Sequence, residues 1–194
     1  GANIGDTLAS MASENPRAKY ICVEPEPTFF AFLEANTARI ADGLQQRPVL
    51  LRQFVGQQAV TGQLVSSHGT AKVISTHTSA EIVNSITLEQ IINTHAPSSE
   101  QRTLLVKSDV DGWDYDVIRS LGPVLDDENL IVYMECQTQT SEQHESYVRF
   151  FEELAPKNFH FTIFDNFGNL VIFNGDNQQV ISLLDYVWAQ EKGI

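Results

Sequence analysis

The chain lacks the features that mark membrane-spanning and secreted proteins. No apolar run approaches the roughly 18 to 20 residues that span a bilayer, and the amino terminus has no basic-then-apolar secretory pattern. Only two cysteines occur, Cys22 and Cys136, each inside or just after an apolar run. Free thiols in such runs act as small hydrophobes in a reducing compartment. We therefore expect a cytoplasmic protein without a disulfide.

Positive charge is also scarce. Twelve Lys and Arg stand against 25 Asp and Glu, for a formal net charge of -13. Such a chain repels phosphate backbones and anionic lipid headgroups, so we expect neither nucleic acid nor a membrane surface as a partner. A cationic or neutral small ligand fits this charge better. With 42% hydrophobic residues, the 194 residues are expected to form one folded domain over 1–194, whose oligomeric state the sequence leaves open.

Apolar runs of strand length alternate with helical patterns, which predicts an α/β fold with a mostly parallel sheet flanked by helices. Thr28 is expected to cap the helix over 28–40, while Thr87 with Gln90 and Thr140 with Gln143 predict capping boxes. The predicted strands are 19–24, 49–55, 104–109 and 130–136, and further helices are expected after Gly5 and over 113–121 and 180–188.

Two antiparallel excursions are expected beside this sheet. The polar segment at about 57–78, which is interrupted by glycines, predicts an antiparallel hairpin. His68 and His77 bracket it and could approach a substrate, although histidines in turns are more often ordinary surface residues. Strands over 161–164 and 170–173, separated by a turn at 165–169, predict that the sheet ends in an antiparallel hairpin.

The chain opens directly on a glycine-rich turn, residues 1–6, that leads into a helix. Such a turn normally follows a strand. No strand precedes it here, so we expect an amino-terminally truncated domain whose first strand is missing from the sequence. Gly1 and Gly5 allow a tight bend and close approach of a ligand, and Asn3 tolerates a left-handed backbone.

Asp6 stands where the dinucleotide fingerprint G-x-G-x-x-G has its last glycine. A carboxylate there competes with a pyrophosphate for the backbone donors of the helix amino terminus. A ligand with ammonium and sulfonium charge, such as S-adenosylmethionine, suits the site better. The alternative is a plain loop with an Asp helix cap.

Two strand ends carry further charged residues. Glu24, followed by Pro25, comes about 20 residues after the turn, where a carboxylate can accept hydrogen bonds from ribose hydroxyls; a solvated carboxylate is the alternative. Alternation along the later strand puts Lys107, Asp109 and Asp111 on one side, at the end of the sheet where such folds bind ligands. The alternative there is a structural Lys-Asp pair.

These motifs together resemble the FkbM family of S-adenosylmethionine-dependent methyltransferases. Its pattern G-A-N-x-G-D, E-P, T-L-[DE] and K-x-D-x-[ED]-G-x-[ED] corresponds to residues 1–6, 24–25, 87–89 and 107–114. The resemblance implies a Rossmann-like fold and methyl transfer to a hydroxyl of a sugar or natural-product small molecule. Asp111 replaces the usual Glu, and Trp113 replaces a small residue, which affects substrate choice.

The resemblance gives a set of expected site residues. Lys107, Asp109 and Asp111 are the expected catalytic residues, with one aspartate bordering the reacting centre and Lys107 tuning its ionisation. A Mg²⁺ ion held by Asp109, Asp111 and Glu135 is possible but not favoured, so no metal ligand is assigned. A noncatalytic nucleotide-binding or scaffold domain and an NAD-type oxidoreductase remain as alternative functions. The expected cofactor-binding residues are Gly1, Ala2, Asn3, Gly5, Asp6, Glu24, Pro25 and Asp109.

Overall fold

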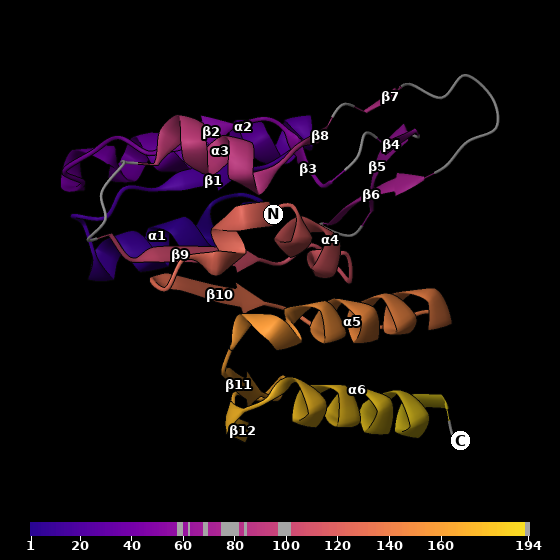
Figure 1. Ribbon diagram of the computed structural model, residues 1–194. Coiled ribbons are helices and arrows are strands. Elements are labelled where there is room, and N and C mark those ends of the chain that lie inside the picture. The colour runs from indigo at the N-terminus through magenta and orange to yellow at the C-terminus, as the bar shows by residue number, and fades with distance from the viewer. Residues whose placement is uncertain are drawn as a thin grey trace.

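The structure, a computed structural model, describes residues 1–57, 60–61, 63–67, 70–74, 82–83, 85–96 and 102–192. It is a mixed α/β structure in which two parallel strand pairs carry the site (Figure 1). No helix in these described ranges has both the length and the hydropathy to cross a membrane.

The first parallel pair joins β1 (Ile21–Val23) to β2 (Val49–Leu51), with Cys22 opposite Leu50. Helix α1 (Asp6–Glu14) precedes β1, and α2 (Pro27–Ile40) followed by the short η1 (Ala41–Gly43) connects the two strands. Leu8, Cys22 and Leu33 are buried together between these elements. The predicted strand over 49–55 is in fact two, because β3 (Phe54–Val55) leaves β2 after two residues without strand pairing.

The prediction that Thr28 caps α2 is wrong. Glu26 is the capping residue, because its carboxylate accepts a hydrogen bond from the Phe29 amide at 2.7 Å. Pro27 then occupies the first turn, where its missing N–H costs nothing. The pattern Glu-Pro-Thr offers two possible caps, and proline settles the choice by fixing the helical backbone before Thr28 is reached.

The predicted antiparallel hairpin is confirmed in the strands β5 (Gln63–Ser67) and β6 (Thr70–Ile74), which pair with Leu64 opposite Val73. β4 (Val60–Thr61) pairs antiparallel with β7 (Ile82–Val83), and β3 pairs in parallel with β8 (Ser85–Ile86). His68 and His77 lie outside the described residues.

The second parallel pair joins β9 (Leu104–Ser108) to β10 (Leu130–Met134), with Lys107 opposite Tyr133. Helix α3 (Leu88–His95) precedes β9, while α4 (Asp114–Arg119) and the short η2 (Gly122–Asp126) connect β9 to β10. The predicted helix over 113–121 is therefore shorter, and β10 ends before Cys136. Both expected capping boxes, at α3 and at α5 (Ser141–Leu154), are present.

Helix α5 packs against α6 (Asn177–Lys192) in the lower part of the molecule (Figure 1). Between them, after the short η3 (Ala155–Lys157), β11 (Phe161–Phe164) and β12 (Leu170–Gly175) form the predicted antiparallel hairpin. Its turn is held by the Asp165 carboxylate, which accepts the amides of Phe167 and Asn169. The main core lies between α4, α5, α6 and the strands β9 to β11, around buried residues that include Ile118, Leu121, Tyr147 and Phe150.

The chain near its amino terminus lies between the two parallel pairs. The Ala2 amide donates to the Val23 carbonyl at the end of β1, at 2.8 Å, and Gly1 packs against the Asp109 carbonyl just beyond β9. Among the described strands, none pairs with both β1 and β9. The carboxyl ends of β1 and β9 therefore meet at residues 1–2.

Candidate active site

The opening turn has the backbone that its residues predict. Asn3 is left-handed with φ 48°, and Gly5 has φ 89°. The Gly5 amide closes the turn on the Ala2 carbonyl at 2.9 Å, and α1 begins at Asp6. No side chain caps this helix, so the alternative in which an Asp caps it is wrong. Asp6 is instead an exposed residue of the first turn.

Packing explains why glycine occupies two positions of this turn. A Cβ on Gly5 would lie 2.8 Å from the Leu33 Cδ1, and a Cβ on Gly1 would collide with the Asp109 carbonyl oxygen. Both positions bring segments of the protein close together. The sequence predicted that these glycines let a ligand approach the backbone. The structure shows that they also let two segments of the protein pack closely, with no ligand involved.

Glu24 is the residue that joins the turn to β1 and α2. Its side chain is buried, at 4% exposure. One carboxylate oxygen accepts the Asn3 amide at 2.8 Å, and the other accepts the Glu26 amide at 3.0 Å. A solvated strand-end carboxylate, the alternative considered from sequence, is therefore wrong. Each oxygen keeps a further lone pair for another donor, and Pro25 lies between the two glutamates.

The end of β9 holds an ion pair. The Lys107 Nζ lies 2.8 Å from an Asp109 carboxylate oxygen, and the two side chains are 27% and 51% exposed. The expected strand alternation stops short of Asp111, because β9 ends at Ser108 and Asp111 has φ 53°. Asp111 is thus carried by a turn beyond the strand.

Gly112 locks this turn against the chain that follows β10. Its φ is 90°, and a Cβ there would lie 2.7 Å from the Gln137 carbonyl oxygen and 2.8 Å from the Gln143 Nε2. Gln143 itself accepts the Gln139 and Thr140 amides at the start of α5. The segments that follow β9 and β10 are therefore packed directly together.

Glu135, just after β10, faces the acidic residues of the β9 end. Burial raises its pKa, repulsion from Asp109, Asp114 and Asp111 raises it further, and Lys107 opposes these effects. The carboxylates of both strand ends thus share one electrostatic environment. Over the described part of the chain, no three His, Cys, Asp or Glu side chains are grouped so that they could hold a metal ion. Asp109, Asp111 and Glu135 are therefore not grouped in that way in the described structure.

A buried network lies under the turn. Asp114 is fully buried, and one of its carboxylate oxygens accepts the Ser108 hydroxyl at 2.5 Å and the Val110 amide at 3.2 Å. The Tyr147 hydroxyl lies 3.5 Å from the other oxygen and donates to the Glu135 carbonyl at 3.0 Å. Sequence reasoning placed Asp114 in a motif without a role and missed Ser108 and Tyr147. A carboxylate in a first helical turn usually serves its own helix, so only the fold reveals that this one points back to the strand.

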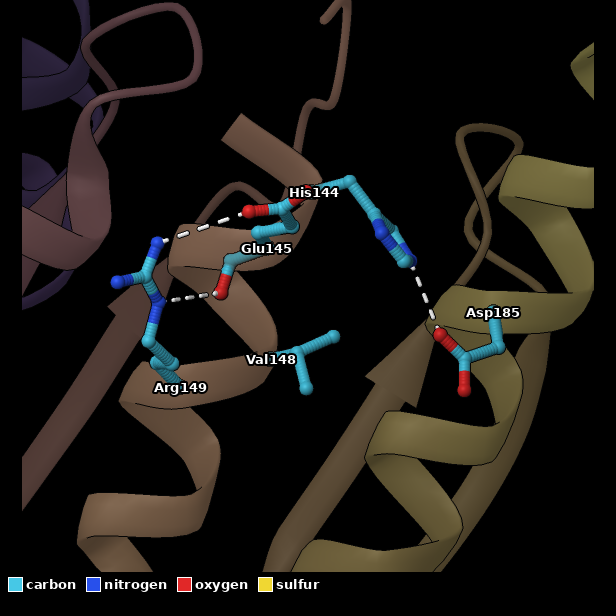
Figure 2. Close-up of a pocket in the computed structure, with 5 residues that line it drawn as sticks. All are labelled: His144, Glu145, Val148, Arg149 and Asp185. Atoms are coloured by element: carbon cyan, nitrogen blue, oxygen red, sulfur yellow. Dashed lines mark hydrogen bonds and ion pairs between the residues drawn. The ribbon is translucent and has the colours of Figure 1, made fainter. Parts of the chain in front are cut away.

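A separate pocket lies between α5 and α6 (Figure 2) and contains none of the predicted site residues. The His144 Nε2 lies 3.0 Å from an Asp185 carboxylate oxygen, and the imidazole stacks on Trp188. These contacts join the two helices, so we assign them to packing. The pocket is lined by His144, Glu145, Val148, Arg149 and Asp185.

Comparison with known proteins identifies the family. A family model described as the methyltransferase FkbM domain matches residues 1–161. Neither a curated protein nor a solved structure matches the chain. The matched span includes the opening turn, Glu24, the end of β9 and the buried network. The chain therefore belongs to the FkbM methyltransferase domain family.

Proposed function

We propose that the chain is an S-adenosylmethionine-dependent O-methyltransferase that methylates a hydroxyl of a sugar or natural-product small molecule. Family membership supports methyl transfer in general. The observation that supports the finer proposal is the meeting of the β1 and β9 ends at the opening turn, with the Glu24 carboxylate buried beneath that turn. Open α/β sheets bind their ligands in such a crevice. We extend the proposal to a Rossmann-like sheet in a single domain over 1–194.

The donor set fits this cofactor. Glu24 has two lone pairs left for ribose hydroxyls after it accepts the Asn3 and Glu26 amides. Asp6, in the first turn of α1, disfavours a pyrophosphate at that helix terminus and favours a cationic ligand. The residues proposed to hold the cofactor are Gly1, Ala2, Asn3, Gly5, Asp6, Glu24, Pro25 and Asp109. When bound, S-adenosylmethionine supplies the electrophilic methyl group.

The chain's own residues align the acceptor and remove its proton. Most of the acceleration of such a displacement comes from holding the nucleophile in line with the methyl group. A hydroxyl nucleophile must also lose its proton to a group within hydrogen-bond reach. Asp109 and Asp111 are the proposed acceptors of that proton, and Lys107 holds Asp109 through the 2.8 Å ion pair.

Calorimetric titration tests the proposal. We expect the protein to bind S-adenosylhomocysteine and not NAD, because Asp6 and the carboxylates at the strand ends repel a pyrophosphate. Binding of NAD alone would reject the proposal in favour of an oxidoreductase. Cofactor binding without methylation across a panel of hydroxyl acceptors would instead favour a noncatalytic domain.

A further inference from the structure

A fully buried carboxylate lies directly beneath the turn that carries Asp109 and Asp111. One Asp114 oxygen accepts both the Ser108 hydroxyl, at the end of β9, and the Val110 amide, between the two aspartates. These contacts tie the first residue of α4 back to the strand. The backbone on either side of Val110 is therefore held from below.

Tyr147 lies between this carboxylate and the end of β10. Tyr147, fully buried on α5, has one hydroxyl proton, which it donates to the Glu135 carbonyl at 3.0 Å. Its oxygen lies 3.5 Å from the second Asp114 oxygen. The ends of both strands, and the helix that follows β10, thus contact one buried group.

The turn needs such support, because Asp111 has φ 53°. A non-glycine residue in the left-handed region keeps that conformation only when its surroundings fix it. The hydrogen bond from the Val110 amide to Asp114 spans Asp111 and Gly112, and so closes the turn. Packing of Gly112 against Gln137 secures the other side.

We propose that Asp114 is a positioning residue that fixes the backbone carrying Asp109, Asp111 and Glu135, and that its loss lowers turnover more than cofactor affinity. It touches neither reacting group itself. The inference about turnover rests on the proposed methyltransferase function. The inference about the backbone rests only on the contacts above.

Two substitutions at this position separate the hydrogen bonds from the charge. Asp114→Asn keeps an oxygen for Ser108 and Val110, and its amide can donate to the Tyr147 oxygen, so every contact is satisfied. Asp114→Leu has a similar shape but removes all acceptors, and leaves the buried Ser108 hydroxyl and the partly buried Val110 amide without that partner. Asp116→Leu is the matched control, because Asp116 lies on the same helix and accepts the Gln57 amide, outside this network.

Steady-state kinetics and calorimetry give the first readout. We expect Asp114→Leu to lower kcat about 100-fold, the cost of a displacement of about 1 Å. Affinity for S-adenosylhomocysteine should fall much less, because Asp109 is one of several residues proposed to hold the cofactor. Asp114→Asn should restore most of the kcat, and Asp116→Leu should leave it unchanged. Full kcat in Asp114→Leu would overturn the proposal. So would equal losses of kcat and of cofactor binding that match the loss of folded protein, because they would show only unfolding.

Tyr147→Phe is the milder test should Asp114→Leu fail to fold. It keeps the ring in the core and removes only the hydroxyl, so the Glu135 carbonyl loses its partner. We expect a smaller fall in kcat with unchanged cofactor affinity. An unchanged kcat in a folded Tyr147→Phe protein would overturn the proposal.

Amide hydrogen exchange gives a readout that needs no activity. Exchange of the Val110 amide should be faster in Asp114→Leu and unchanged in Asp114→Asn, while exchange in α1 stays as in the parent protein. If the parent protein neither binds the cofactor nor turns over, and Val110 exchange is still faster in Asp114→Leu, the proposed function is rejected while the positioning of the turn is supported. Unchanged Val110 exchange in Asp114→Leu would overturn the positioning itself.

Discussion

Glu24 has a structural task, and we propose a second one in cofactor binding. Its carboxylate accepts backbone amides from the opening turn and from the start of α2, which fixes both segments at the end of β1. We propose that the lone pairs that remain accept hydrogen bonds from the ribose hydroxyls. A single side chain thus orders two segments of the chain, and we propose that it also binds the ribose.

Glu24→Gln tests this dual role. Glutamine offers one oxygen and one amide, so either the Asn3 or the Glu26 amide would face another donor. We expect affinity for S-adenosylhomocysteine to fall about tenfold or more, because hydrogen bonds to charged groups contribute about 1.5–3 kcal/mol. Calorimetry measures the affinity, and Glu34→Gln, the same change at an exposed position of α2, is the control. Equal affinities in the two variants would remove Glu24 from the site.

Asp114 should make stability depend on pH. Burial raises its pKa above the ordinary value, although the hydrogen bonds from Ser108 and Val110 oppose part of this effect. A raised pKa means that the folded state binds the proton more tightly than the unfolded state. The stability contribution of Asp114 is therefore most favourable below about pH 3.9, its unfolded pKa, and is lost as the pH rises through the raised folded pKa.

Asp114→Asn removes this titration. We expect the variant to gain stability relative to the parent protein between pH 4 and pH 7, with the larger advantage at the higher pH. Chemical denaturation at both pH values measures the difference in the free energy of unfolding. If the stability advantage of Asp114→Asn over the parent protein instead shrinks as the pH rises, the fold favours the charged form of Asp114, and the account of its pKa is wrong.

Among elements, the turn after β9 is the one that the account depends on most. Gly112→Ala would place a methyl group at φ 90° and 2.7 Å from the Gln137 carbonyl oxygen. We expect a loss of at least about 1–2 kcal/mol of stability, the cost of a left-handed residue with a Cβ, and a fall in turnover. Thermal unfolding and steady-state kinetics measure the two effects.

Gly43→Ala is the control for that substitution. Gly43 has no positive φ, and a Cβ there would meet nothing within 4 Å. We expect its stability and turnover to match those of the parent protein. Equal behaviour of the two alanine variants would show that the turn accommodates a side chain and that its packing on Gln137 is not needed.

The starts of α3 and α5 were predictable from the sequence, whereas the cap of α2 and the strand ends were less so. The capping boxes at Thr87 and Thr140 depend on residues three apart, which a sequence shows directly. The end of β9 depends on Asp111 and Gly112 meeting Gln137 and Gln143, which come from a distant part of the chain. Alternation alone therefore placed Asp111 on the same side as Lys107 and Asp109, as if the strand continued past its end.

At the scale of the whole molecule, the alternation of strands and helices predicted the parallel pairs and the closing hairpin, because each depends on local patterns. The sequence placed Glu24 at a strand end after the opening turn and predicted ribose contacts for it, but it did not predict the 2.8 Å hydrogen bond from the Asn3 amide to Glu24. It gave no means to find the network of Ser108, Asp114 and Tyr147. That network depends on how α5 packs over the ends of β9 and β10, which is decided by the tertiary fold.

The central claim is that the carboxyl ends of β1 and β9 hold the methyl donor by its ribose. A crystal structure of the complex with S-adenosylhomocysteine tests it most directly. We expect both ribose hydroxyls within hydrogen-bond distance of the Glu24 carboxylate, and the sulfur on the side of Asp109. Adenosine bound elsewhere, with Glu24 contacting only the Asn3 and Glu26 amides, would contradict the account.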